Sequence, residues 1–169
     1  GNTVGEENIV FVSSPDPQLD DTLPFTAYPK SSVATVLEPI GDTAFTGTVR
    51  DTLSEPLVVR VLDSQGKAVA GATVEFTPLE SDAQILTPGS ALVSNYQGRV
   101  KARYRLGGRA GTQTVMARLA GDQTVTFTIT GKAAAARNLI KLSGDEQSGT
   151  VKTALAEPFA ILAMDADQN

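Results

Sequence analysis

Three oxygen-bearing side chains stand at alternate positions near the end of the sequence. Asp165, Asp167 and Asn169 have the D-x-D-x-N spacing with which a calcium-binding loop begins, because alternate side chains can turn their oxygens towards one hard cation. A related segment earlier in the chain begins at Asp63 and reaches Lys67 without a second acidic residue. Since Asp and Asn also favour plain turns, we interpret both segments as turns and expect neither a metal ion nor a cofactor.

A second group of side chains could bind an anion. The row consists of Arg99, Lys101, Arg103 and Arg105. Alternate residues of a strand share one face, and Arg109 and Arg118 could extend that face into a positive strip for an anionic glycan or lipopolysaccharide. Basic residues also keep a sheet face solvated and discourage edge pairing. Because the chain has a net charge of −5, we favour the solvated face and keep ligand binding as the alternative.

The residue types that are missing exclude most catalytic chemistry. The 169 residues include neither His nor Cys, so they provide no Ser-His-Asp or Cys-His nucleophile, no His ligand for zinc and no disulfide. A carboxylate pair, a Ser-Lys dyad or an oxygen-ligand metal site remains, but 19 acidic residues and many Ser and Lys make such groups frequent by chance. The acidic balance also argues against nucleic acid, whose phosphates require a positive surface. We therefore expect a protein that is not an enzyme and does not bind nucleic acid.

Across the middle of the chain, apolar residues alternate with polar residues. The pattern occurs in residues 57–62, 72–76, 100–106, 114–119 and 124–130. Turn residues separate these segments, as at 63–67 and 120–123. Short alternating segments between turns predict antiparallel strands of a sandwich or barrel. Leu57, Val59 and Val61 are typical of the face that we expect in the core.

One segment of the sequence occurs twice. Residues 47–57 (GTVRDTLSEPL) reappear as residues 149–159 (GTVKTALAEPF), an offset of 149 − 47 = 102 residues. About a hundred residues is the size of one sandwich domain. The repeat therefore predicts that a second domain of the same kind begins near the C-terminal end.

At these segments the chain resembles a bacterial immunoglobulin-like domain of group 1, the invasin and intimin type. The matching segments are residues 69–76 (VAGATVEF), 98–102 (GRVKA), 106–111 (LGGRAG) and 144–151 (GDEQSGTV). The resemblance implies an all-β fold, an immunoglobulin-like antiparallel β-sandwich, in residues 31–133. Residues 134–169 then hold a linker and the opening strands of a second, incomplete domain. The proline-rich residues 1–30 are interpreted as an extended connector.

The resemblance also implies a function. Modules of this family serve as spacers, as adhesin stalks and as receptor-binding tips. We therefore expect a non-catalytic structural or adhesive module on a bacterial cell surface or secreted protein, with neighbouring immunoglobulin-like domains of the same chain as its partners. The alternatives are a binding domain for an anionic envelope glycan or a host receptor, through the basic row, and an accessory domain of an enzyme.

The apolar C-terminal segment needs a pairing partner. Residues 155–164 belong to strands that would not stay ordered alone. We expect them to pair either with residues 8–12 (NIVFV) or with a neighbouring molecule by strand exchange between chains.

Overall fold

The computed structural model describes residues 8–13, 22–27, 33–87 and 91–169, and these residues form strands and no helix. No helix in this part of the chain is therefore long and apolar enough to cross a bilayer. The strands in chain order are β1 (Asn8–Ser13), β2 (Thr22–Ala27), β3 (Val36–Pro39), β4 (Ala44–Thr48), β5 (Leu57–Leu62), β6 (Thr73–Pro78), β7 (Gln84–Ile85), β8 (Ala91–Val93), β9 (Arg99–Ala102), β10 (Tyr104–Arg105), β11 (Gly111–Leu119), β12 (Thr124–Lys132), β13 (Asn138–Ser143) and β14 (Ala160–Met164).

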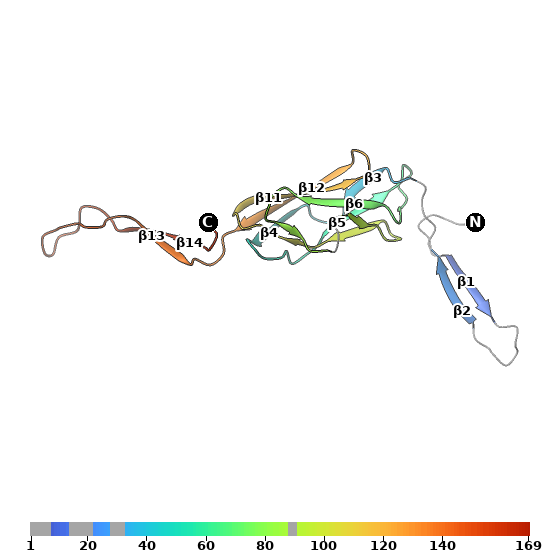
Figure 1. Ribbon diagram of the computed structural model, residues 1–169, viewed down its shortest axis with the longest axis horizontal. Coiled ribbons are helices and arrows are strands. Elements are labelled where there is room, and N and C mark those ends of the chain that lie inside the picture. The colour runs from blue at the N-terminus through green and yellow to red at the C-terminus, as the bar shows by residue number, and fades with distance from the viewer. Residues whose placement is uncertain (1–7, 14–21, 28–32, 88–90) are drawn as a thin grey trace.

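Two sheets form the layers of a sandwich. One has the strand order β4-β12-β11-β6-β8, and the other has the order β3-β5-β9 (Figure 1). Both sheets contribute to one apolar core, in which Val59 of β5 and Phe127 of β12 are fully buried. Each such side chain contributes about 1.5–3 kcal/mol when it leaves water. The chain thus folds as the immunoglobulin-like β-sandwich that the resemblance implies.

The alternating segments pack as the sequence predicts. Leu57, Val59 and Val61 are 0% exposed, whereas Val58 and Arg60 between them are partly exposed. The predicted hairpin is formed by β11 and β12, which pair antiparallel with Val115 opposite Phe127. The inward residues of these two strands are all buried: Val115, Ala117, Leu119, Val125, Phe127 and Ile129.

One strand pairing departs from the antiparallel prediction. β3 pairs antiparallel with β5, but β4 pairs parallel with β12. The chain crosses from one sheet to the other between these strands, at Gly41, whose φ of +78° is a conformation that glycine adopts without strain. Because β4 pairs with β12 of the five-stranded sheet and runs in the same direction, that sheet is mixed rather than purely antiparallel.

The segment predicted as one strand over residues 100–106 is interrupted at Arg103. β9 pairs with β5, whereas β10 pairs with β7. Between them, the amide of Arg103 donates to Thr87 Oγ1 at 2.9 Å. The alternation nevertheless continues through the break, and the buried residues are Val100, Ala102, Tyr104 and Leu106. The strand changes partner while the same face stays in the core.

A hairpin lies within the N-terminal segment that the sequence suggests is an extended connector. β1 and β2 pair antiparallel over six residues each, with Phe11 opposite Pro24. Pro24 is tolerated because a strand with one neighbour has an outer edge that needs no amide donor. The prolines Pro15, Pro17 and Pro29, on which the prediction also rests, lie outside the described residues.

The C-terminal segment pairs with its own hairpin partner. β14 pairs antiparallel with β13, and β1 pairs with β2, so the predicted pairing of the tail with residues 8–12 is wrong. The physical reason is that far fewer residues separate β14 from β13 than from β1, so closing the loop between β13 and β14 costs less conformational entropy. Figure 1 shows the β13–β14 hairpin beyond one end of the sandwich.

The β13–β14 pairing has the register of the β3–β5 pairing. In the sandwich Leu37 lies opposite Val61, and 102 residues later Leu139 lies opposite Ala163. The hydrogen bond before each pairing is also the same in kind: Thr35 N donates to Leu62 O at 2.9 Å, and Arg137 N donates to Met164 O at 2.7 Å. The two halves of the sequence repeat therefore have the same local backbone structure here.

Candidate functional site

The D-x-D-x-N segment after β14 is an Asx turn. Asp165 Oδ1 accepts hydrogen bonds from the amides of Asp167 and Asn169, at 2.9 and 3.0 Å. The earlier segment is built in the same way, since Asp63 Oδ1 accepts from the amides of Gln65 and Lys67, both at 2.9 Å. Each turn is thus closed by the side chain of its first residue.

The oxygens that a calcium ion would need are used by hydrogen-bond donors. Asp165 Oδ2 accepts from the amide of Ala134 and from Asn169 Nδ2, both at 2.9 Å. Within the described ranges, no group of three or more acidic, His or Cys side chains could hold a metal ion. The residues of this turn therefore fit a structural contact better than a cation site.

Arg50 joins the turn to the end of the sandwich. Its Nε donates to both carboxylate oxygens of Asp167, at 3.2 and 3.1 Å, and its Nη2 donates to Oδ1 at 2.5 Å. Arg50 Nη1 also lies 3.1 Å from Asp82 Oδ2. The hydrogen bond to Asp167 raises the pKa of Arg50, and the guanidinium in turn lowers the pKa of Asp167. A planar guanidinium that contacts two carboxylates fixes their orientation as well as their charge.

Asn169 makes a second contact between the turn and the sandwich. Its Nδ2 donates to Gly108 O at 2.7 Å, and its Oδ1 accepts from Ala110 N at 2.7 Å. Gly108 leaves room for the adjacent ion pair, because a β-carbon there would lie 2.4 Å from Arg50 Nη2 and 2.6 Å from Asp167 Oδ1. A side chain at this position would therefore displace the pair.

Asp165 anchors the turn to the linker as well. Only 2% of its surface is exposed, and hydrogen bonds from the side chain and backbone of Asn169, with further ones from Ala134 and Asp167, lower its pKa to about 2. We call Arg50, Asp82, Gly108 and Ala110 the docking face of the sandwich. The contacts of this face and of Ala134 with Asp165, Asp167 and Asn169 are called the junction.

A buried glutamine organises the loop that carries half of the docking face. Gln113 Oε1 accepts from Tyr104 Oη and from the amide of Gly107, both at 2.9 Å. Its Nε2 donates to Arg109 O at 2.8 Å. Burial raises the pKa of Tyr104, so its hydroxyl stays protonated and able to donate. These bonds fix the backbone of residues 107–110.

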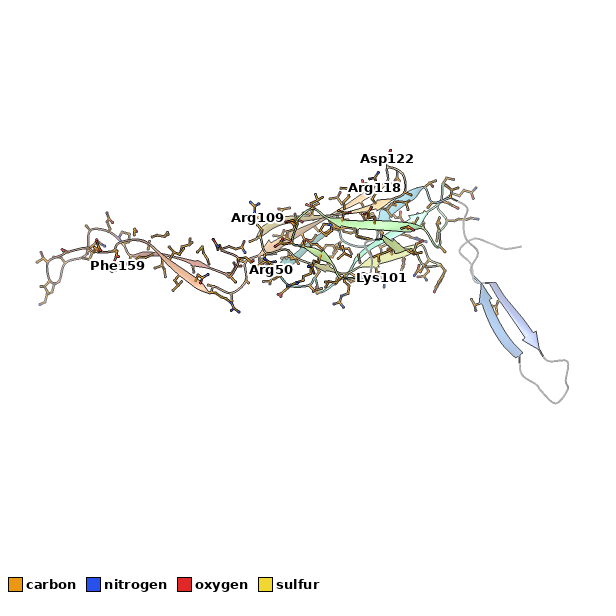
Figure 2. The ribbon with its side chains drawn as sticks, in the orientation of Figure 1. Arg50, Lys101, Arg109, Arg118, Asp122 and Phe159 are labelled. Carbon is orange, nitrogen blue, oxygen red and sulfur yellow. The ribbon has the colours of Figure 1, made fainter. Side chains whose placement is uncertain are left out.

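The four residues of the basic row are all exposed. Arg99 and Lys101 lie on β9, in the three-stranded sheet, and Arg60 of β5 stands opposite Arg99. Arg105 is engaged locally, because its Nε donates to Arg50 O at 2.9 Å. Arg118 does not extend the row, since it lies on β11 in the other sheet (Figure 2).

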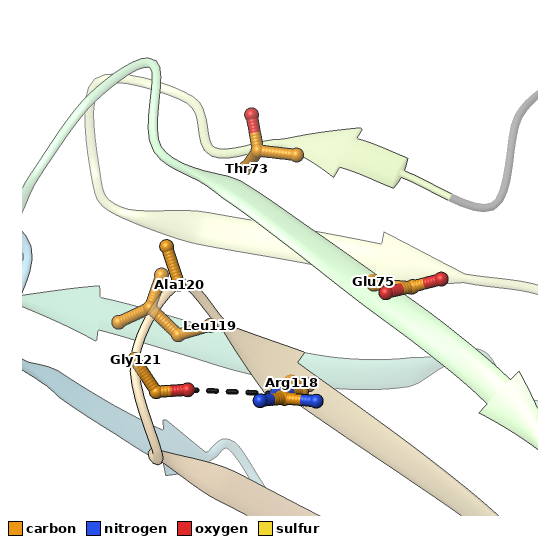
Figure 3. A pocket seen from close by; sticks show the side chains of 6 residues that line it. All are labelled: Thr73, Glu75, Arg118, Leu119, Ala120 and Gly121. Atoms are coloured by element: carbon orange, nitrogen blue, oxygen red, sulfur yellow. Dashed lines mark hydrogen bonds between the residues drawn. The ribbon is translucent and has the colours of Figure 1, made fainter.

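A pocket opens on the five-stranded sheet. It has a volume of about 310 Å³ and is lined by Thr73, Glu75, Arg118, Leu119, Ala120 and Gly121 (Figure 3). Glu75 and Arg118 are cross-strand neighbours, and Arg118 Nε lies 3.5 Å from Gly121 O. A carboxylate beside a guanidinium is common on a solvated sheet face, so Glu75 and Arg118 do not indicate a ligand.

The sequence predicts the turn but not its partners. The spacing of Asp165, Asp167 and Asn169 indicates a turn, whereas no motif marks Arg50 or Asp82 as its contacts. One signal is present: Arg50 stands in the repeated segment, and Lys152 stands 102 residues later with the same charge. Both residues have positive φ, +67° and +69°, which is uncommon for such side chains.

No protein-family model matches the chain. Among solved structures, domains 4–9 of the surface layer protein SbsC share 16% identity, with 88% of this chain and 22% of that chain covered and a TM-score of 0.46. The Escherichia coli adhesin FdeC shares 19% identity, with 89% and 47% covered and a TM-score of 0.47. A Parabacteroides merdae β-glucuronidase shares 13%, with 66% and 14% covered and a TM-score of 0.42.

The chain spans less than half the length of each of these structures. At such low similarity, the fold assignment depends on the strand pairings and the core described above. By those criteria the chain is an immunoglobulin-like β-sandwich, followed by a hairpin that repeats its first antiparallel pairing and contacts its end.

Proposed function

We propose that this chain is a non-catalytic structural module of a bacterial surface or secreted protein, and that it acts as a spacer in a tandem array of immunoglobulin-like domains. Residues 31–133 form one unit, and residues 134–169 are a linker and the opening strands of the next. The observation that carries the proposal is the junction, in which Arg50 and the backbone of residues 108 and 110 hold the turn of the second unit. A spacer requires such contacts, because domains that are joined only by a linker reorient freely.

Exposed apolar side chains in the C-terminal repeat segment and β14 support the array. Val151, Phe159 and Ile161 are 87%, 76% and 65% exposed, while the residues 102 positions earlier, Val49, Leu57 and Val59, are 1%, 0% and 0% exposed. Ile161 pairs in the same register as Val59, and Val151 and Phe159 stand at the matching positions of the sequence repeat. These side chains are therefore suited to the core face of a second sandwich. A covering sheet of the same kind would bury them.

The junction favours a stiff connection. A single exposed ion pair contributes only about 0–1 kcal/mol, but here the turn makes three separate contacts. Asp167 binds Arg50 and Asn169 binds the backbone of Gly108, both in the first unit, while the buried carboxylate of Asp165 binds Ala134 in the linker. Only residues 133–137 separate β12 from β13. A short linker together with three separate contacts leaves few orientations for the hairpin.

Small-angle X-ray scattering of the whole chain tests the spacer. The proposal expects one elongated shape to account for the data, and it expects the double variant Arg50→Gln, Asp167→Asn to need an ensemble of orientations. The segment before residue 31 contributes equally to both samples, so the comparison isolates the junction. Identical, equally broad ensembles for parent and variant would argue against a spacer.

A second candidate function is binding of an anionic envelope glycan or a host receptor. The exposure of Arg99, Lys101, Arg103 and Arg105, and the location of Arg60 beside them, favours it. A glycan array with the variant Lys101→Glu, Arg103→Glu tests this function, and Arg118→Glu on the other sheet is the matched control. Arg105 is left unchanged because it contacts Arg50. If the parent gives no signal, this function is ruled out for the glycans on the array.

A further inference from the structure

We propose that the docking face selects which unit can follow the sandwich, by recognising the third and fifth side chains of that unit's Asx turn. The partner that fits is an Asx turn with a carboxylate at the third position and an asparagine at the fifth. This inference depends on the proposed function, because it concerns the order of units in an array.

The third position must supply a carboxylate. In the docked turn this residue is Asp167, which accepts three hydrogen bonds from Arg50 and leaves Arg50 Nη1 for Asp82. In the sandwich's own turn the third residue is Gln65. Its amide has one acceptor oxygen and no charge, so it could not accept from Arg50 through two charged oxygens as the carboxylate of Asp167 does.

The fifth position must both donate and accept. Asn169 Nδ2 donates to Gly108 O, and Asn169 Oδ1 accepts from Ala110 N. The sandwich's own turn has Lys67 at this position. An ammonium group only donates, so a turn with lysine would leave the amide of Ala110 without its partner and would add a second cation close to Arg50.

The backbones of the two turns do not differ in a way that could make the selection. In both turns the first aspartate accepts from the third and fifth amides. In both turns its own amide also donates to the fifth carbonyl, at 2.9 Å for Asp63 and 3.2 Å for Asp165. The two turns differ at the second to fifth positions, and the side chains that bond to the docking face are those at the third and fifth positions. A second copy of the first unit could not dock on this face, and the order of units is encoded in the turn.

Distances between two spin labels measure the docking directly. The chain has no cysteine, so the substitutions Thr126→Cys on β12 and Leu139→Cys on β13, both at exposed positions, provide the only attachment sites. We expect the parent to give one narrow distance distribution. The variant Asp167→Gln, Asn169→Lys gives the docked turn the third and fifth residues of the sandwich's own turn. This variant should lose the narrow distribution.

The reciprocal exchange is the matched control. The variant Gln65→Asp, Lys67→Asn makes the opposite chemical change in the sandwich's own turn and should keep the narrow distribution. Since the exchanged side chains lie outside the core, an unchanged thermal midpoint of the sandwich shows that each variant is folded. The single variant Asp167→Asn preserves the shape of the side chain and should also broaden the distribution.

The outcomes separate this inference from the proposed function. A narrow parent distribution with an equally narrow distribution after the Asp167→Gln, Asn169→Lys exchange would overturn the selection and leave the spacer intact. A broad distribution for the parent would overturn both. The selection is supported if the parent and the reciprocal control give narrow distance distributions and the Asp167→Gln, Asn169→Lys variant gives a broad one.

Discussion

Gln113 is the residue on which the loop of the docking face most depends. It is 1% exposed, and its one amide serves Tyr104 Oη, the amide of Gly107 and the carbonyl of Arg109. A buried polar group that loses its partner costs about 1–3 kcal/mol. The side chain is therefore structural, although its type is polar.

We expect Gln113→Leu to lower the free energy of unfolding by at least about 2 kcal/mol, because three groups lose their partner at once. Urea unfolding of the whole chain measures the change. Gln97→Leu, at an exposed position, is the control and should leave the midpoint almost unchanged. Equal midpoints for the two variants would contradict the role given to Gln113.

The carboxyl group of Asp165 gives the junction a pH dependence. Its pKa is lowered to about 2 while Asn169, Ala134 and Asp167 donate to it, whereas the group titrates near its ordinary value of 3.8 when these hydrogen bonds are broken. The open turn therefore binds more protons in this range. The closed turn, and its hold on the linker, is fully favoured above about pH 4 and weakens as the pH falls towards 2.

A pH titration followed by NMR tests this assignment. The amide of Ala134 donates to Asp165 Oδ2, so its proton chemical shift should report the protonation of that carboxyl group, with a midpoint near the lowered pKa of about 2. A midpoint at the ordinary aspartate value would mean that Asp165 does not accept these hydrogen bonds.

At the scale of elements, the sandwich uses the same turn more than once. Asn95 Oδ1 accepts from the amides of Gln97 and Arg99, at 3.0 and 2.9 Å, as Asp63 and Asp165 do in their turns. The fourth residue of each turn has positive φ: +77° at Gly66, +73° at Gly98 and +67° at Gln168. A residue other than glycine is tolerated at this position where space allows it.

This comparison predicts unequal effects for Gly66→Ala and Gly98→Ala. Both substitutions place a β-carbon in the left-handed region, at a cost of about 1–2 kcal/mol. Around Gly66 nothing lies within 4 Å of that atom, whereas at Gly98 it would lie 2.4 Å from Val61 O. Because Val61 N donates to Gly98 O at 2.8 Å, the backbone cannot move away without losing a bond.

Urea unfolding of the two alanine variants measures the difference. We expect Gly98→Ala to be clearly the less stable variant, while Gly66→Ala shows only the backbone cost. Equal losses of stability would mean that the contact between Gly98 and β5 is looser than the structure describes.

The sequence predicts the faces of these strands better than their partners. Alternation identified Leu57, Val59 and Val61 as core residues because the side-chain period of a strand is local. The break at Arg103 and the parallel pairing of β4 with β12 depend on which edge is available in three dimensions. The junction is of the same kind, since Arg50 and Asp167 are 117 positions apart.

At the scale of the whole molecule, the sequence repeat predicts how the chain is divided into units, and the structure shows which residues connect the sandwich to the C-terminal hairpin. The offset of 102 residues predicts a second unit, and the register of β13–β14 agrees with that of β3–β5. Nothing local in residues 165–169 shows where their side chains bind, because the acceptor groups belong to the docking face. The spacer and the order of units both depend on this face.

Residual dipolar couplings of backbone amides test the central claim most directly. We expect the amides of β5 and β12 in the sandwich and those of β13 and β14 in the hairpin to fit one common alignment tensor of the same magnitude. A much smaller tensor for the hairpin would mean that it reorients independently of the sandwich, which would contradict a stiff junction and the spacer built on it.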